Sequence, residues 1–365
     1  MEKKIKVFGA ALDATDFPLN IQTKYAYLNS LTQNLITEPN FLDPYEGFLL
    51  YSSILSKEKY HKIGKFPVES WLTPKPNIED YPFVNQLEFQ KFTINEKLKE
   101  KSDLLEKFII DKVFPDIPLM IGVDHSLTGG VLSALSNKFG AENIIVIVFD
   151  AHFDAIPASI STNIAKYTID HPDQVNPLVP ELASLADEDL NIKNSYTCAS
   201  FLYYLMQEKK LLPENLIIFG CQDYPDDDYR SNNDPRIVEY VNFYNSFEKK
   251  GVRFISKNDS AHMVERLSSA LELVDTPYFY LSFDVDVGGL KEIIAARFKN
   301  AIGLDKSVLL NAGKKIKEYM DLKRCKLIGL DVMEIDTHLL CRAFPKSGRI
   351  DQTVEIVDKF LDFFI

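Results

Sequence analysis

One stretch of the sequence reads Ile144-Ile145-Val146-Ile147-Val148-Phe149-Asp150-Ala151-His152-Phe153-Asp154. Six apolar residues come first, and two aspartates and a histidine follow them. A continuous apolar run of this length indicates a strand that is buried on both faces, as in a parallel sheet. Alternate residues of an extended segment point the same way, so Asp150, His152 and Asp154 can face one pocket. Because such groups cannot stay buried without partners, the stretch predicts a polar site at the end of a buried strand.

Two more parts of the chain repeat this arrangement. The apolar run 118–122 leads to Asp124-His125-Ser126, and the run 278–283 leads to Asp284 and Asp286. The last two carboxylates would raise each other's pKa unless a cation neutralised them. All three clusters follow strand ends, where open α/β sheets place their sites. Together they suit two adjacent divalent metals holding a hydroxide. For the cluster at Asp150, His152 and Asp154 taken alone, a hydrogen-bonded structural network is the alternative.

Apolar runs alternate with helical patterns along the chain. The runs that we expect to be strands are 5–8, 119–122, 144–149, 216–219, 252–255, 278–283 and 326–330, with 48–51 as a weaker eighth. The helical patterns are 87–113, 127–139, 201–210, 237–250, 261–274, 306–320 and 352–364, and Asp305 is a plausible N-cap for the sixth of them. This alternation predicts a doubly wound α/β fold with a mostly parallel eight-stranded sheet and helices on both faces.

Two stretches do not fit the alternation. We expect one domain over residues 1–365, with irregular insertions at about 36–86 and 155–196. Loops of this length are uncommon unless they are functional. The second insertion begins directly after Asp154, so it is well placed to wall the predicted site.

Composition narrows the function classes. With 365 residues, of which 46% are hydrophobic and 26% charged, the chain can bury a sizeable core. The net charge of -12 disfavours nucleic acid as a partner and would mildly attract cationic substrates, although it can equally serve solubility alone. The four cysteines form no CxxC pair, no signal peptide is evident, and no apolar run reaches membrane-spanning length. We therefore expect a cytoplasmic protein that binds neither nucleic acid nor a membrane.

The clusters resemble the motifs of the arginase, agmatinase and formimidoylglutamase family, the ureohydrolases. Gly122-Val123-Asp124-His125-Ser126 resembles the family's Gly-Gly-Asp-His-Ser, and Asp150-Ala151-His152-Phe153-Asp154 matches its Asp-Ala-His-x-Asp. Ser282-Phe283-Asp284-Val285-Asp286 matches Ser-x-Asp-x-Asp. Gly329-Leu330-Asp331-Val332-Met333-Glu334 resembles the family strand that ends in a carboxylate for the guanidinium group. The resemblance spans roughly residues 118 to 336 and implies an arginase-like α/β fold.

The resemblance also implies a site for two Mn²⁺ ions. The six implied ligands are His125, Asp150, His152, Asp154, Asp284 and Asp286. One metal would take His125 and Asp154 and the other His152 and Asp286, with Asp150 and Asp284 bridging the two around a hydroxide. The complete set weighs against the related single-zinc deacetylases, and its oxygen-rich character favours manganese over zinc.

Catalytic roles follow from the same resemblance. Hydroxide would attack the guanidinium carbon, and Asp154 would pass the hydroxide proton to the leaving amine. Glu334 would bind the guanidinium through charge-assisted hydrogen bonds, with a surface ion pair as the alternative for this residue. Asp331 is expected to be a structural partner. The products would be urea and an amine.

Departures from the family pattern bear on the substrate. Ile156 stands where arginases place an Asn that reads the amino-acid head group, and Thr197-Cys198-Ala199-Ser200 replaces a His-Gly dipeptide that is a candidate proton shuttle. The family's Asp-Pro after the third motif is replaced by Val287-Gly288-Gly289. His171 is a candidate replacement for the shuttle. We therefore expect guanidinium chemistry without recognition of a free amino-acid head group.

The expected substrate is a guanidino compound, with arginine inside a peptide, converted to ornithine, as the leading hypothesis. An agmatine-like or arginine-like small guanidine and a formimino or amide substrate are the alternatives. A further alternative is that the protein is a metal-binding homologue without catalytic activity. We also expect a homo-oligomer.

Overall fold

The computed structural model describes residues 4–35, 41–57, 60–171, 194–257, 261–300, 302–344, 346 and 348–365. Its centre is one sheet with the strand order β2-β1-β3-β8-β7-β4-β5-β6, in which every neighbouring pair is parallel. The strands are β1 (Ile5–Ala10), β2 (His61–Lys65), β3 (Ile117–Gly122), β4 (Ile144–Phe149), β5 (Leu216–Phe219), β6 (Arg253–Ile255), β7 (Tyr278–Asp284) and β8 (Lys326–Met333). A separate antiparallel pair joins β9 (Ala343–Phe344) to β10 (Arg349–Ile350).

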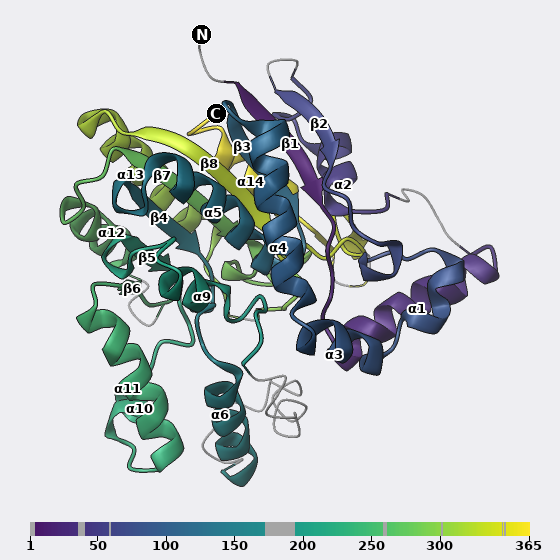
Figure 1. Cartoon of the computed structure of the whole chain (residues 1–365), viewed down its shortest axis with the longest axis horizontal. Helices are drawn as coiled ribbons and strands as arrows, with labels where there is room; N and C mark the ends of the chain where they lie inside the picture. Colours follow the sequence, from purple (N-terminus) through teal and green to yellow (C-terminus); the bar gives the residue numbers. More distant parts are fainter. Residues whose placement is uncertain are drawn as a thin grey trace.

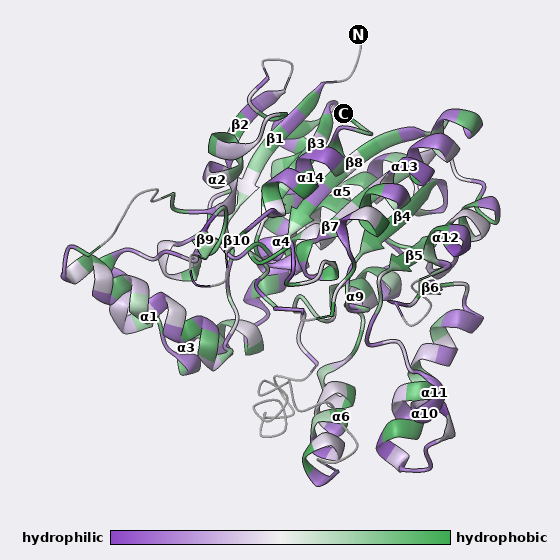
Figure 2. Ribbon diagram, turned by 180° about the vertical axis from the view of Figure 1, so that it is seen from behind, coloured by the Kyte–Doolittle hydropathy of each residue, from purple (hydrophilic) through white to green (hydrophobic). Residues whose placement is uncertain are grey.

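Helices cover both faces of the sheet (Figure 1). On one face the strands pack against α4 (Lys97–Phe108), α5 (Thr128–Phe139), α9 (Phe201–Gln207) and α11 (Pro235–Lys249). On the other they pack against α2 (Pro44–Tyr51), α12 (Met263–Glu272), α13 (Lys306–Lys323) and α14 (Thr353–Leu361). The hydrophobic residues are concentrated in the central strands (Figure 2). The predicted doubly wound α/β fold is confirmed.

The remaining helices lie away from the central sheet. They are α1 (Pro18–Thr32), α3 (Gln86–Ile94), α6 (Ala158–Asp170) and α10 (Asp227–Ser231), and Figure 1 shows α1 and α3 together at one side and α6 below the sheet. No helix in the described ranges combines the length and the apolar character that crossing a membrane requires.

The weak eighth strand predicted at 48–51 is wrong. These residues belong to α2, which Pro44 begins at the first turn and Asp43 caps by accepting from the Glu46 N–H. A short apolar run fits a strand and a buried helix equally well by periodicity. The eighth strand is instead β2, a polar and largely exposed edge strand whose sequence, His61–Lys65, carries no apolar run.

Two helix predictions need correction. The pattern at 87–113 is divided into α3, α4 and the π-helical segment Ile109–Val113, because Glu96 adopts a left-handed φ of 55° between the first two. Asp305 does precede α13, but its side chain makes no capping hydrogen bond. The Lys306 N–H donates instead to the Glu292 carboxylate at 2.7 Å. A side chain distant in sequence therefore caps α13.

The two predicted insertions differ in content. The first contains α2, β2 and the 3-10 turns Ser70–Leu72 and Ile78–Phe83, so it is less irregular than expected. The second contains α6, and its residues 172–193 lie outside the described part of the chain.

The strand order brings the sequence motifs together. β8 lies between β3 and β7, and β7 pairs with β4. Phe149 at the end of β4 is in register with Phe283 of β7, and Phe283 is in register with Val332 of β8. Because all four strands are parallel, their carboxyl ends share one edge, and the residues that follow each strand meet there.

Candidate metal centre

Short turns after the strands position the six predicted ligands. His125 opens the 3-10 turn His125–Leu127 after β3, and Asp286 lies in the turn Val285–Val287 after β7. In all three clusters a carboxylate accepts from the backbone N–H two residues later. Asp124 Oδ1 accepts from Ser126 at 3.1 Å, Asp150 Oδ1 from His152 at 2.7 Å and Asp284 Oδ1 from Asp286 at 2.8 Å. At Asp150 and Asp284 these local bonds leave the second carboxylate oxygen to face the site.

The first ligand group is fully buried. The Nδ1 atom of His125 lies 3.3 Å from Asp150 Oδ2, 2.8 Å from Asp154 Oδ2 and 3.2 Å from Asp284 Oδ2. The potential ligand atoms of these four residues lie within 4.8 Å of one another. One nitrogen and three carboxylate oxygens at this spacing fit a hard or borderline divalent cation.

The second group shares Asp150 with the first. His152 Nδ1 lies 2.9 Å from Asp286 Oδ2 and 3.4 Å from Asp150 Oδ1, so Asp150 offers one oxygen to each group. The His152 side chain is 48% exposed, so this group is more open to solvent. The arrangement of Asp150 fits the expected bridging carboxylate. Asp284 belongs to the first group alone, and its bridging role stays a prediction.

Several buried atoms of the site make no hydrogen bond among the described residues. They include His125 Nδ1, Asp150 Oδ2 and Asp286 Oδ2. A buried polar atom without a partner is costly, and atoms that converge from different strands without hydrogen bonds suit metal coordination. The residues therefore fit the metals that the sequence resemblance implies.

The charges of the site are strongly coupled. Burial lowers the pKa of His125, but the adjoining carboxylates of Asp150, Asp154 and Asp284 outweigh it and raise that pKa well above its usual value. Burial also lowers the pKa of His152, and the carboxylates of Asp286 and Asp150 raise it well above the usual value. Burial, together with the charge of Asp150, raises the pKa of Asp154 to about 7. The same carboxylates that raise the pKa values of the histidines would also attract a metal cation, so protons and metal compete for the site.

Metal affinity is therefore expected to fall as the pH falls from 8 to 6. Metal ligation needs neutral imidazoles and ionised carboxylates, whereas the raised pKa values of His125, His152 and Asp154 favour protons at low pH. Manganese binding should release protons, which calorimetric titration in buffers of different ionisation enthalpy measures. His61→Ala, which removes an exposed histidine of β2, should show the same pH dependence. An affinity that is constant from pH 6 to 8 would contradict this assignment.

A chain of side chains orients His125. Its Nε2 lies 2.8 Å from Ser282 Oγ, and that hydroxyl donates to Asp331 Oδ1 at 2.6 Å. Because the hydroxyl hydrogen points to Asp331, Ser282 can accept the Nε2–H, which leaves Nδ1 as the free ligand atom. The second oxygen of Asp331 accepts from Thr128 and Tyr280. Asp331 has the structural role expected of it.

Asp154 and Glu334 have strained backbones. Their φ angles are 28° and 59°, in a region that non-glycine residues seldom occupy. Backbone hydrogen bonds hold both: the Asp154 carbonyl accepts from the Leu202 N–H at 3.0 Å, and the Glu334 N–H donates to the Val123 carbonyl at 2.9 Å. Such strain costs on the order of 1–3 kcal/mol per residue and clusters at functional sites.

A pocket of about 290 Å³ opens over the ligands. His152, Asp154, Asp284, Asp286 and Glu334 line its polar base. Apolar or weakly polar residues line much of the rest: Phe17, Ile156, Ile164, Cys198, Ala199, Tyr240 and Phe298. The pocket therefore combines a charged floor with apolar walls.

The two positions that depart from the family pattern are part of this wall. The Ile156 N–H donates to the Ala199 carbonyl at 3.0 Å, which ties the 197–200 segment to the end of the second motif. His171, the candidate shuttle, stacks on Tyr167 with ring centroids 4.3 Å apart. It is not among the described residues that line the pocket, so the structure does not support a shuttle role.

Glu334 is where the motif predicts it, at the pocket floor, and is 2% exposed. Burial raises its pKa to about 8, against the opposing effect of the Arg297 guanidinium. Arg297 is the site residue that the sequence reasoning missed, because it belongs to no motif. Phe17 and Phe298 were missed for the same reason.

A parallel α/β sheet with paired histidine–carboxylate groups at the ends of its central strands defines a metal-dependent hydrolase of the ureohydrolase class. A sequence model of the arginase family matches residues 55–343, and the chain belongs to that family. Enzymes of the family are metal-dependent hydrolases that act on C–N bonds of amidino groups, and they use a binuclear metal centre. No curated protein matches the sequence at a significant level.

Solved structures share the fold at low sequence identity. Proclavaminate amidino hydrolase from Streptomyces clavuligerus is 16% identical with a TM-score of 0.56, over 99% of this chain and 91% of that one. Formiminoglutamase from Trypanosoma cruzi is 14% identical with a TM-score of 0.53, over 99% and 92%. Arginase from Bacillus caldovelox is 14% identical with a TM-score of 0.52, over 99% and 97%. At these identities the likeness shows a common fold.

Proposed function

We propose that the protein is a manganese-dependent ureohydrolase that acts on a guanidino group carried by a neutral stem, with arginine inside a peptide as the substrate class that fits best. The observation that carries this proposal is the lining of the pocket. Its floor combines the ligand groups with Glu334, and its walls are largely apolar. We further propose that the protein works in the cytoplasm as a homo-oligomer.

Six residues would hold two Mn²⁺ ions: His125, Asp150, His152, Asp154, Asp284 and Asp286. Four of the six are carboxylates, and such oxygen-rich sets suit manganese better than softer metals. When bound, the two ions would lower the pKa of a coordinated water and so supply a hydroxide nucleophile near neutral pH. Ser282 and Asp331 would keep His125 Nδ1 directed at its metal.

Side chains of the protein would bind the substrate and transfer a proton. The Glu334 carboxylate at the pocket floor would accept hydrogen bonds from the guanidinium N–H groups and orient its carbon over the ligand groups. Asp154, which also lines the pocket, would hold the proton of the attacking hydroxide and deliver it to the leaving nitrogen. The apolar walls would exclude bulk water and so strengthen both electrostatic interactions.

The residues that line the pocket do not favour a substrate with a charged head group. Among the described lining residues there is no Lys or Arg to pair with a free carboxylate. Asp223 is the lining carboxylate outside the ligand groups and Glu334, and its oxygens accept from the Cys221 thiol at 2.9 Å and the Phe153 N–H at 3.2 Å. The carboxylate of a free arginine would therefore lose hydration without a new cationic partner, whereas the amides of a peptide bring no charge.

A substrate panel tests the proposal. Manganese-loaded protein should release urea from an arginine-containing peptide with a kcat/KM about tenfold or more above that for free arginine or agmatine, and mass spectrometry should show ornithine in the peptide. The same protein treated with EDTA should be inactive. Faster turnover of free arginine or agmatine would overturn the peptide assignment. Bound metal without urea from any guanidine would favour the non-catalytic alternative.

A further inference from the structure

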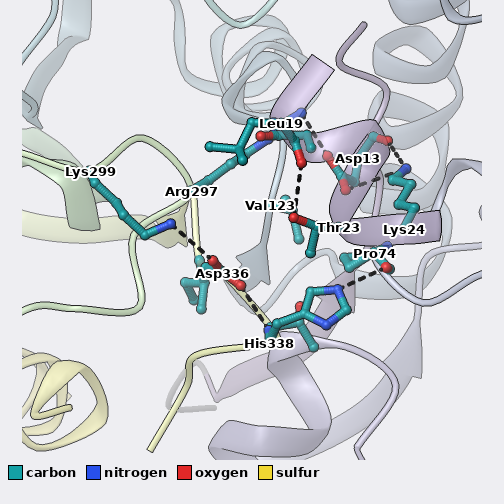
Figure 3. A pocket seen from close by; sticks show the side chains of 13 residues that line it. Asp13, Leu19, Thr23, Lys24, Pro74, Val123, Arg297, Lys299, Asp336 and His338 are labelled. Carbon is teal, nitrogen blue, oxygen red and sulfur yellow. Dashed lines mark hydrogen bonds and ion pairs between the residues drawn. The ribbon is translucent and has the colours of Figure 1, made fainter. Parts of the chain in front are cut away.

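A buried arginine of the chain lies beside the carboxylate that would bind the substrate. Arg297 Nη1 is 3.5 Å from Glu334 Oε2, and Arg297 Nη2 is 2.7 Å from Asp13 Oδ1. Asp124 lies on the same side, 3.9 Å from Nη1. The Arg297 side chain is 4% exposed. Figure 3 shows it extending towards Asp13 at the edge of a small cavity that Lys24 and Asp336 also line.

Backbone pairing fixes Arg297 in this place. Its N–H donates to the Glu334 carbonyl at 2.7 Å, and the Asp336 N–H donates to the Ala295 carbonyl at 2.9 Å. Ala296 and Ile335 form an antiparallel bridge between these bonds. The backbone of Arg297 is therefore tied directly to the segment that carries Glu334.

The cluster has more carboxyl groups than cations. Asp13, Asp124 and Glu334 share Lys24, which lies 3.3 Å from Asp13 Oδ2, and Arg297. Of the three acids, Glu334 lines the pocket over the ligand groups, whereas Asp13 lines the small cavity that Arg297 also lines.

Glu334 keeps free positions for a ligand. An ionised carboxylate has about four lone-pair sites. Oε1 accepts from the His125 N–H at 3.3 Å, and Oε2 faces Arg297. Two sites remain, enough for one edge of a guanidinium group. Removing Arg297 would leave Glu334 without the cation that fixes its direction, next to the like-charged Asp124.

We propose that Arg297 is a positioning residue that holds the Glu334 carboxylate in the orientation that binds a substrate guanidinium. This inference rests on the proposed function insofar as Glu334 binds the substrate. It predicts a specific loss of guanidinium binding when Arg297 is replaced, with the metal ligands unaffected. An arginine with a solely structural role would lower the fraction of folded protein and leave the KM of that fraction unchanged.

The test uses manganese-loaded full-length protein and methylguanidine as the probe, whose binding is measured by calorimetry whether or not turnover occurs. Arg297→Met should raise the Kd of methylguanidine and the KM of the best guanidine substrate by about tenfold or more, with a smaller change in kcat. Arg297→Lys should recover part of the loss, because one ammonium cannot reach Asp13 and Glu334 together as a fork does. Metal content should match the wild type in both variants.

Two further variants control the experiment. Lys299→Met removes a neighbouring cation that pairs with Asp336 at 3.6 Å and is 41% exposed, and it should leave Kd and KM unchanged. If Arg297→Met does not fold, Asp13→Asn combined with Arg297→Met keeps the excess of one carboxyl group and should show the same raised Kd.

The two proposals can fail separately. Wild-type Kd and KM in folded Arg297→Met, Arg297→Lys or the double variant would overturn the positioning role while the ureohydrolase activity stands. Methylguanidine binding that depends on Arg297, without urea release from any guanidine, would support the positioning role and overturn the proposed function. A wild-type protein that binds no methylguanidine would overturn the positioning role as well.

Discussion

Asp150→Asn is expected to abolish hydrolysis and to reduce the metal content from two ions per chain to at most one. Asp150 offers one oxygen to each ligand group, 3.3 Å from His125 Nδ1 and 3.4 Å from His152 Nδ1. Burial raises the pKa of Asp150, but the hydrogen bonds of His125 and His152 lower it to about 2, so the group is ionised under all conditions of interest. The amide keeps the shape and removes the charge that both metals would share.

We expect kcat/KM to fall by about 10³-fold or more, because a group shared by both metals acts on the whole centre and its loss is not compensated by a neighbour. Metal content by mass spectrometry and urea release check the result. Asp227→Asn, an exposed position in the first turn of α10, is the matched control and should behave as the wild type. Full metal content with undiminished turnover in Asp150→Asn would contradict the proposed ligand set.

Glu334→Gln is expected to weaken guanidine turnover by about 10²-fold or more, mainly through KM, while the metal content stays at the wild-type value. The change removes the charge from a carboxyl group that is 2% exposed and has the Arg297 cation beside it. Truncating one partner of a buried hydrogen-bonded charge pair costs about 2–5 kcal/mol, and each 1.4 kcal/mol is a factor of about ten. The amide also offers an N–H that a guanidinium cannot accept.

This variant also separates the substrate classes. A cationic guanidinium needs the carboxylate strongly, whereas a neutral amide does not, so we compare Glu334→Gln and Glu334→Ala on a peptide arginine and on formimino and amide substrates. Activity retained on a formimino or amide substrate in both variants would favour that alternative. Methylguanidine binding by calorimetry, with Asp227→Asn as the reference protein, shows whether the loss lies in binding.

Much of the site could be read from contiguous residues. The alternation Asp150, His152, Asp154 after a six-residue apolar strand, and its echo at Asp284 and Asp286, depends on the period of an extended chain and on burial. Neither property needs distant contacts. The confirmed strand predictions rest on the same two properties. Prediction from apolar runs fails at 48–51, because a short apolar run does not discriminate a strand from a helix, and at β2, because an exposed edge strand has no apolar signal.

The sequence by itself predicted the candidate site: the ligand types, their spacing, the strand ends that carry them and the carboxylate at Glu334. The tertiary structure alone decided how these meet. It places β8 between β3 and β7, so that the motifs share one edge, and it sets Arg297 between Asp13 and Glu334, which belong to separate segments. It also forms the apolar walls from Phe17 and Phe298. Contacts of this kind join residues from separate segments and leave no local period in the chain, and therefore only the packed fold reveals them.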